Sequence, residues 1–463
     1  MKEAILCIDI GSTNTKVTAI DAHSPAILGS ATAYTTVETD VSNGLIRALK
    51  FLQQKTGPLN FTARFAASSA AGGLRMIASG LAPSLTQTAA KMACLGAGAK
   101  VIQNFAYKLT QEDIAEIFAQ KPDIFLLVGG TDGGNEEVVL HNAKLLGAKE
   151  PAFPILYAGN RSVKEEVLTY LSAWDVRTCE NVMPRLEKLN ALPVQEEIRA
   201  LFLEHIIHAK GLSDIAAQMD LPLIPTPAAV LLAMELLSDG TPEEAGIGEL
   251  VAVDLGGATT DVYSIAKGEP NIGDAIVKGI PEPYAKRTVE GDIGMRYSAE
   301  GVLEAAGAQK LADISQLTVD EVNSMIQHLR KHPETLPQSS KELSLDRAIA
   351  QCAVELALTR HAGHVETIYT AQGPTILQIG KDLTQVKNLI LTGGAIIHNP
   401  QAKDIATAAM FDPEHPDSLK PKNADVMIDK SYILAACGLL SQTNPKAALQ
   451  LMKKELNENG TYQ

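Results

Sequence analysis

Alternating hydrophobic and polar stretches predict two copies of one strand–turn–strand unit. Residues 4–21 read as an apolar strand, a polar turn and a second strand, and residues 249–268 repeat this order. Each copy has an aspartate two residues before a glycine, hydroxyl side chains in the turn and a β-branched exit strand. The separation of Asp9 and Asp254 is about the length of one lobe. The repeat therefore predicts two related lobes.

The segment between the two copies alternates strand and helix patterns. Residues 123–148 and 154–175 each read as a buried strand, a turn and a helix, which is typical of an α/β fold with a parallel sheet. A helix that starts at a proline follows at 225–244. Because 463 residues exceed what one hydrophobic core usually serves, we expect two domains, residues 1–245 and 246–463.

The second half predicts further helices and one marked strand. Residues 315–357 carry two amphipathic helical patterns, broken by prolines and polar residues around 332–340. A strand that ends in a Gly-Gly turn follows at 388–400, and the apolar run at 432–442 reads as a final buried helix. The residues from Glu455 onward are expected to be frayed.

Composition narrows the classes of function. The net charge of -14, without a basic stripe, argues against a nucleic-acid partner, because phosphate binding depends on Lys and Arg. Asp9 interrupts the first apolar run before it reaches signal-peptide length. The apolar run around 228–234 falls short of the roughly 20 residues that span a bilayer. We expect a cytoplasmic protein with no membrane partner.

Cysteine and histidine spacing does not favour a metal centre. No C-x-x-C pair is present, and we expect buried, reduced thiols at the five cysteines, Cys7, Cys94, Cys179, Cys352 and Cys437. Two histidine pairs have a helical spacing of three. Without a nearby third ligand we expect exposed helix positions for His205, His208, His361 and His364.

The two Asp-Gly turns carry the candidate chemistry. Neither a P-loop nor a G-x-G-x-x-G turn between strand and helix is present. Polyphosphate binds backbone N–H groups, which glycine lets approach closely, and small hydroxyls. The turns offer Gly11, Ser12, Thr13 and Asn14 in the first copy and Gly256, Gly257, Thr259 and Thr260 in the second. Each turn alone reads as a plain hairpin, but together with the Gly-Gly turn they predict a nucleotide site.

These segments resemble the nucleotide motifs of the actin/Hsp70/sugar-kinase superfamily. DIGSTNTK at 9–16 resembles its phosphate-1 motif, DLGGATTD at 254–261 its phosphate-2 motif, and LILTGGAII at 389–397 its adenosine motif. The resemblance implies a two-lobed, ribonuclease-H-like ATPase fold with a central nucleotide cleft. It also implies two crossing helices, at 225–237 and 432–440.

Within that superfamily the chain resembles the MutL/GlmL group, which is unrelated to the mismatch-repair protein of the same name. The strings that indicate this group are FAASSAAGGLRM at 65–76, LLVGGTDGGNEE at 126–137, YAGNRSV at 157–163, ENVMP at 180–184 and RTVEGDIGMRYSA at 287–299. The group consists of accessory proteins of adenosylcobalamin-dependent glutamate mutase and aminomutases. The resemblance implies an ATPase that reactivates such a mutase by releasing damaged cobalamin.

The resemblance also implies roles for single residues. Asp9 would orient Mg²⁺, and Asp254 would polarise the attacking water; both would hold the metal mainly through water. The small turn residues named above would cradle the ATP phosphates, and Gly393 and Gly394 would lie against the adenosine. Lys16 either approaches phosphate or points to solvent, and Glu290 and Asp292 either reach the cleft or cap the next helix.

Other functions stay open at this point. A small-molecule kinase of the sugar-kinase type shares the fold and would use Asp254 as a general base. An electron-transferring dehydratase activator resembles the first turn, but its cluster needs cysteines that are placed differently. A binder that holds nucleotide without turnover is a further alternative. The sequence does not identify the client mutase, and it leaves a homo-oligomer open.

Overall fold

The computed structural model describes most of the chain as two units. The described residues are 1–11, 13–36, 40–69, 74–209, 212–271, Gly273, 275–371, 373–458 and 461–462, without the side chains of Ser84, Leu203, 205–209, 457–458 and 461–462. Unit 1 comprises Met1–Ala233, Gly279–Pro283 and Ala435–Ala448; unit 2 comprises Met234–Lys278, Tyr284–Leu434 and Leu449–Gln463. The domain boundary at residue 246 remains a prediction about the nucleotide lobes.

The first predicted strand–turn–strand unit is a hairpin in a five-stranded sheet of unit 1. Three antiparallel strands come first, and two parallel strands lie beyond β1, in the order β10-β4-β1-β2-β3. Helix α1 packs on the sheet through Leu45, Ala48 and Leu52. The elements are β1 (Lys2–Ile10), β2 (Asn14–Asp21), β3 (Ile27–Tyr34), α1 (Val41–Thr56), β4 (Leu59–Ser68) and β10 (Ile224–Pro225).

A sheet of the same strand order lies in unit 2. Its order is β16-β14-β13-β19-β20-β21, so an antiparallel trio is again followed by two parallel strands beyond the first strand. The strands are β13 (Leu250–Leu255), β14 (Thr260–Ile265), β16 (Ala285–Glu290), β19 (Asn388–Thr392), β20 (Asp425–Ile428) and β21 (Thr461–Tyr462). This repeated order confirms the α/β class and the two ribonuclease-H-like sheets of the actin/Hsp70/sugar-kinase fold. The cleft between lobes stays a prediction.

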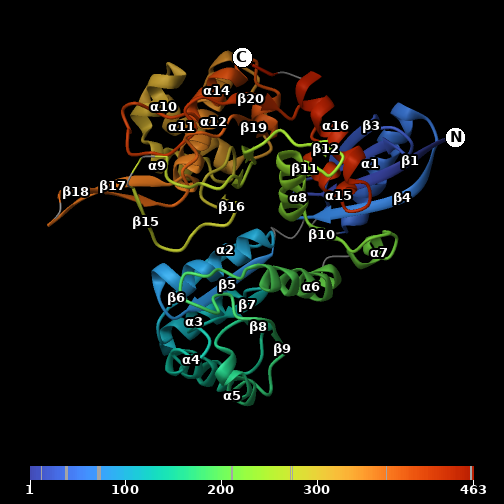
Figure 1. The fold of residues 1–463 in the computed structure, drawn as a ribbon. Coiled ribbons are helices and arrows are strands. Elements are labelled where there is room, and N and C mark those ends of the chain that lie inside the picture. Colours follow the sequence, from blue (N-terminus) through green and yellow to red (C-terminus); the bar gives the residue numbers. More distant parts are fainter. Residues whose placement is uncertain are drawn as a thin grey trace. The chain divides into compact units, whose positions relative to one another are not determined.

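A parallel α/β segment is inserted into unit 1 (Figure 1). Its five parallel strands follow the order β6-β5-β7-β8-β9. This confirms the alternation of strand and helix predicted for 123–175. The elements are β5 (Arg75–Gly80), η1 (Pro83–Gln87), α2 (Thr88–Gly96), β6 (Lys100–Ala106), α3 (Gln111–Gln120), β7 (Ile124–Leu127), α4 (Glu137–Gly147), β8 (Ile155–Tyr157), η2 (Arg161–Val163), α5 (Lys164–Tyr170) and β9 (Val176–Thr178); α6 (Leu192–Ala209) and α7 (Leu212–Ala216) follow.

Helices of unit 2 form one core with its sheet. The two amphipathic patterns predicted in 315–357 are α11 and α12, and each begins with a capping box, Thr318 with Glu321 and Ser339 with Glu342. The helices are α9 (Ala299–Ala306), α10 (Ala308–Ser315), α11 (Val319–Lys331), α12 (Ser340–His361), α13 (Gly394–Ile397) and α14 (Ala402–Ala408).

The remaining elements include two that the sequence did not predict. The first is a three-stranded sheet of β15 (Ile276–Lys278), β18 (Gly373–Ile379) and β17 (His364–Thr370). The second is α16 (Pro445–Glu458), so the apolar run at 432–442, which contains α15 (Leu434–Ser441), is not the final helix. The fraying expected from Glu455 is wrong as well, because Glu455 lies in α16 and accepts a hydrogen bond from Ser431 at 2.8 Å. Short strands β11 (Gly240–Thr241) and β12 (Glu244–Ala245) complete the set.

His361 corrects one prediction. It lies at the end of α12 but is fully buried, and its ring nitrogens are 2.8 Å from the hydroxyls of Thr288 and Ser264. Burial, followed by the charges of Lys286 and Lys381, holds its pKa well below the usual value. His364 lies in β17 rather than in a helix. The side chains of His205 and His208 lie outside the described residues.

The cysteines are free thiols in largely buried positions. Four are buried and Cys179 is partly buried. Burial raises the pKa of the Cys7 thiol to about 12 and that of Cys352 to about 11, so both stay protonated near neutral pH. Within the described ranges, no group of three or more His, Cys, Asp and Glu side chains could hold a metal ion. The described helices also include none that is long and apolar enough to cross a membrane.

The two helices expected to cross meet within unit 1. They are α8 (Thr226–Asp239) and α15. A Cβ added to Gly438 of α15 would lie 1.8 Å from the carbonyl oxygen of Ala229 in α8. The backbones therefore approach so closely at this point that only glycine fits.

We predict that Gly438→Ala destabilises the protein by about 1–3 kcal/mol, because the added methyl group overpacks this contact. In an exposed helix the same change would stabilise by about 1 kcal/mol, so the sign of the effect is diagnostic. Urea unfolding followed by circular dichroism measures it. Gly273→Ala is the control, since its methyl group would meet nothing within 4 Å. A Gly438→Ala protein as stable as the wild type would contradict the close contact.

Candidate nucleotide site

The first hairpin turn closes on a glycine. The N–H of Gly11 donates to the carbonyl of Asn14 at 3.0 Å, and a Cβ on Gly11 would lie 2.7 Å from that oxygen. Thr35 supports the turn from β3's end: its N–H donates to Thr13 at 2.8 Å, and its hydroxyl lies 2.8 Å from that of Thr15. The turn is therefore narrow and held from one side by buried threonines.

Asp9 lies beside this turn, near the end of β1. Its carboxylate accepts a hydrogen bond from the hydroxyl of Thr226, the first residue of α8, at 2.6 Å. Asp9 is directly opposite Lys16 in the β1–β2 register, so the two side chains share one face of the sheet. The first hairpin thus pairs an oriented carboxylate with a lysine on the same face of its sheet.

The second hairpin turn repeats this geometry in unit 2. The N–H of Gly256 donates to the carbonyl of Thr259 at 2.9 Å, and a Cβ on Gly256 would lie 2.8 Å from that oxygen. Thr260 is buried and donates to the carbonyl of Ile293 at 3.0 Å. Gly11 and Gly256 therefore have the same structural role, and the two turns agree to within 0.1 Å in these contacts.

Residues 296–298, which belong to the sequence RTVEGDIGMRYSA, form hydrogen bonds with the second turn. The carbonyl of Gly257 accepts hydrogen bonds from the N–H groups of Arg296 at 2.8 Å and Tyr297 at 3.0 Å, and Ser298 donates to Ala258 at 2.6 Å. Arg296 is fixed in turn by a two-pronged ion pair with Asp346, at 2.7 and 3.0 Å. The turn is therefore held by hydrogen bonds from a segment that is itself anchored to Asp346.

Gly257 itself faces open space. A Cβ there would meet one neighbouring heavy atom within 4 Å, Cβ of Arg296 at 3.9 Å, and the residue is exposed. The fold has room for a side chain at position 257. The methyl group of an alanine there would therefore occupy the open space next to the backbone, where a ligand could bind. This is the geometry expected where a backbone must approach a phosphate closely.

Asp254 has a second carboxylate directly opposite. Asp261, the last residue of DLGGATTD, is its partner in the β13–β14 register, so both side chains lie on one face. The buried guanidinium of Arg287 binds Asp261 at 2.6 and 2.8 Å. The face that these two strand carboxylates share offers oxygen atoms of the kind that a hydrated cation takes.

The Gly-Gly turn lies against the end of β13. Gly393 has a φ of 115°, and a Cβ on it would lie 2.3 Å from the carbonyl oxygen of Leu255. A Cβ on Gly394 would meet the hydroxyl of Tyr432 at 3.1 Å. The turn therefore runs between the strand end and a tyrosine ring.

Tyr432 and Asp429 were not predicted from the sequence. Asp429 is buried at the end of β20 and accepts hydrogen bonds from the N–H groups of Ile433 at 3.0 Å and Leu434 at 3.3 Å. Burial, and then the negative charges of Asp254 and Asp429, raises the pKa of Tyr432 above its usual value. No local pattern in the sequence indicated these two residues, because both lie far along the chain from Gly393 and Gly394.

The structure groups the predicted residues by unit. Asp9, Gly11, Thr13, Asn14 and Lys16 lie at one hairpin, and Ser12 lies outside the described residues. The second hairpin and its neighbours bring together Asp254, Gly256, Gly257, Thr259, Thr260, Gly393 and Gly394. Nucleotide binding by these residues stays a prediction. Glu290 and Asp292 form ion pairs with Arg360 at 2.8 and 2.9 Å.

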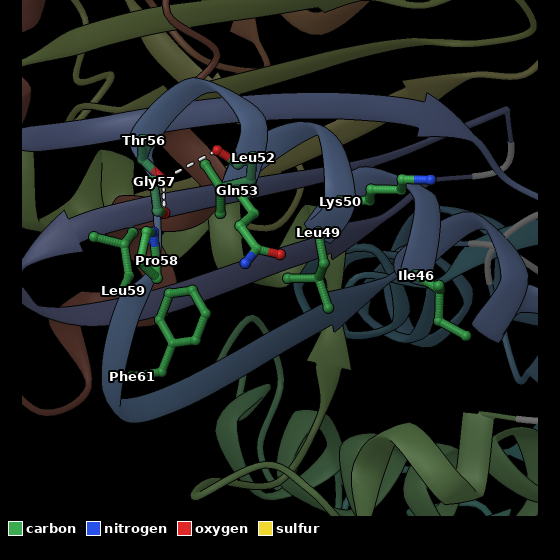
Figure 2. Close-up of a pocket in the computed structure, with 10 residues that line it drawn as sticks. All are labelled: Ile46, Leu49, Lys50, Leu52, Gln53, Thr56, Gly57, Pro58, Leu59 and Phe61. Carbon is green, nitrogen blue, oxygen red and sulfur yellow. Dashed lines mark hydrogen bonds between the residues drawn. The ribbon is translucent and has the colours of Figure 1, made fainter. Parts of the chain in front are cut away.

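An open groove of about 440 Å³ lies elsewhere in unit 1 (Figure 2). Its walls are one face of α1 and the start of β4, with Leu49 and Gln53 above Leu59 and Phe61. The groove contains none of the residues predicted to bind nucleotide. It is therefore separate from the candidate site.

Comparisons with known proteins identify relatives of the whole chain. A family model described as "MutL protein" matches residues 5–456. "Protein MutL" from Clostridium tetanomorphum is 46% identical over 459 residues, which is 98% of this chain and 99% of the relative.

Solved structures are much more distant. The activator of 2-hydroxyisocaproyl-CoA dehydratase from Clostridium difficile, with bound ADPNP, is 10% identical with a TM-score of 0.32, over 99% of both chains. Xylulose kinase from Bifidobacterium adolescentis is 12% identical with a TM-score of 0.33, over 97% of this chain and 93% of the kinase. The fold assignment therefore rests on the strand order described above.

We predict that Gly257→Ala weakens ATP binding at least about tenfold, a loss of roughly 1.4 kcal/mol, while leaving thermal stability unchanged. The methyl group has room in the fold but fills the space through which a phosphate would approach. Titration calorimetry measures the affinity and thermal unfolding the stability. Gly273→Ala is the control, because its methyl group would meet nothing within 4 Å. Gly248→Ala is not suitable, because the φ of 85° at Gly248 would strain an alanine. Unchanged affinity in Gly257→Ala would place the phosphates elsewhere.

Proposed function

We propose, from the premise that this chain belongs to the MutL protein family, that it is an ATP-dependent reactivating factor for an adenosylcobalamin-dependent mutase. The client would be glutamate mutase or an aminomutase such as ornithine aminomutase, and the outcome would be release of damaged cobalamin. The observation that carries the ATPase part is the repeated closed hairpin, with a strand aspartate before each turn.

The residues present fit ATP and Mg²⁺. Gly257 leaves open a cradle that a Cβ would fill, and the turns offer backbone N–H groups and hydroxyls to phosphate. Asp9 and Asp254 supply carboxylate oxygens, with Asp261 opposite Asp254. Magnesium usually keeps several waters and takes one or two carboxylates besides the phosphates, so each hairpin by itself offers the kind of oxygen that the ion takes. When bound, the ion would neutralise charge on the phosphates.

Each group in the site would have a separate task. Asp254 would accept a hydrogen bond from the attacking water and polarise it. Asp9, whose carboxylate is held by the hydroxyl of Thr226, would orient the hydrated metal. Gly393 and Gly394 would lie against the adenosine, with Tyr432 behind them. Hydrolysis in this fold would change the contacts to the terminal phosphate and so drive a hinge motion that acts on the client.

The decisive experiment measures phosphate and cobalamin together. Purified protein with ATP and Mg²⁺ is assayed for phosphate release, alone and with a cobalamin-inactivated aminomutase, while free cobalamin is followed by its absorbance. ATP-dependent release of the cofactor is the expected result. A rate of ATP hydrolysis that does not change with the mutase but increases with a sugar or a small acid would support the kinase alternative instead.

We predict that Asp254→Ala lowers ATP turnover by at least about 100-fold, the usual range for loss of a general base, while nucleotide binding persists. Steady-state phosphate release and calorimetric affinity are the two measurements. Asp425→Ala is the matched control, because this exposed carboxylate lies in register with Leu250, at the far end of the same sheet. Turnover at the wild-type rate in Asp254→Ala would remove its assigned role.

A further inference from the structure

The three-stranded sheet of unit 2 carries an exposed hairpin. Strands β17 and β18 pair without a register break from His364 with Ile379 to Thr370 with Gly373, and Figure 1 shows them as a long hairpin next to β15. All described side chains from Glu366 to Thr370 are exposed. Ile368 is 38% and Tyr369 86% exposed. This sheet thus presents apolar surface that the described part of unit 2 does not cover.

Beyond its first residues, the outer edge of β17 is not paired with any strand in the part of the chain that the structure describes. The N–H of Val365 donates outward, to the carbonyl of Asp417 at 2.9 Å. Because backbone groups alternate in direction along a strand, those of Thr367 and Tyr369 point the same way. Among the described residues, β18 is the one strand that pairs with β17 at these positions. The edge therefore offers N–H and C=O groups for a further strand.

Natural proteins usually protect such an edge with lysine, proline, a bulge or a covering element. β17 contains neither lysine nor proline, and its register has no bulge. Its one carboxylate, Glu366, lies 3.8 Å from Lys278 on β15 and 3.5 Å from His364. The edge therefore lacks these protecting features and presents Ile368 and Tyr369, and its carboxylate lies near a lysine and a histidine, in a protein with a net charge of -14.

We propose that a second copy of this chain covers the edge, with the two β17 strands antiparallel and Ile368 on the twofold axis. Thr367 of each copy then faces Tyr369 of the other, and both residues point their backbone groups across the junction. This junction is isologous, which means that both copies use the same surface. One pairing therefore covers the β17 edge of each copy. The inference goes beyond the proposed function and does not depend on ATP binding.

Register and charge select this pairing. Glu366 falls opposite Thr370 of the second copy, so no like charges meet. Centring the pair on Thr367 instead would bring Val365 opposite Tyr369, but the N–H of Val365 is already bonded to Asp417. An extended segment of another protein could add to the same edge, but it would leave the chain itself monomeric. The oligomeric state therefore separates the two occupants.

Cross-linking tests the register. Residues on the axis form a non-hydrogen-bonded pair with Cα atoms about 4.5 Å apart, within reach of a disulfide. We expect Ile368→Cys to form a covalent dimer under mild oxidation, seen on a non-reducing gel. Tyr369→Cys is more exposed but is not opposite itself, so it should form no covalent dimer on this gel, and neither should the wild type with its five native cysteines, although both associate without a cross-link in solution. Equal cross-linking of both variants would overturn the register.

Light scattering coupled to gel filtration tests the interface. The full chain should elute with twice its mass of 49.2 kDa, and Ile368→Lys, which places two lysines on the axis, should elute as a monomer. Leu336→Lys is the matched control, because Leu336 is 68% exposed in a loop of the same unit, and it should remain dimeric. A monomeric wild type, or a dimeric Ile368→Lys, would overturn the proposal.

Discussion

The closed glycine turn is the constraint on which the candidate site depends. In each ribonuclease-H-like sheet, the first strand must reverse direction within four residues while its aspartate stays at the strand end. Only glycine permits this, because a Cβ on Gly11 or Gly256 would collide with the carbonyl that its own N–H binds. The carboxylate, the hydroxyls and the open backbone of the turn all take their positions from that hydrogen bond.

The two units stabilise the same turn with different neighbours. Unit 1 uses buried threonines, Thr15 with Thr35, and a helix-terminal threonine that orients Asp9. Unit 2 uses a backbone segment fixed by Arg296 and places Asp261 opposite Asp254. The two hairpins therefore differ in what supports the turn and in the residue opposite the strand aspartate, which is Lys16 in the first and Asp261 in the second. This asymmetry fits the proposed division of labour, in which Asp9 orients a hydrated metal and Asp254 acts on water.

The sequence predicted those elements that are determined by short-range patterns along the chain. The hairpins, the α/β alternation and the helices α11 and α12 could be predicted from hydrophobic periodicity and from the spacing of glycines and prolines. The place of Tyr432 at Gly394 and the burial of His361 depend on tertiary contacts between distant segments. The β17–β18 hairpin was missed because its exposed strands lack the half-buried alternation that identifies most strands.

The central proposal is that each hairpin turn binds phosphate groups of ATP. A crystal structure of the wild-type protein with Mg²⁺ and a non-hydrolysable ATP analogue tests it most directly. The account predicts phosphate oxygens within hydrogen-bond distance of backbone N–H groups in both turns, and the metal, through water, next to Asp9 and Asp254. An analogue bound in the groove between α1 and β4, or at the inserted parallel sheet, would contradict the account.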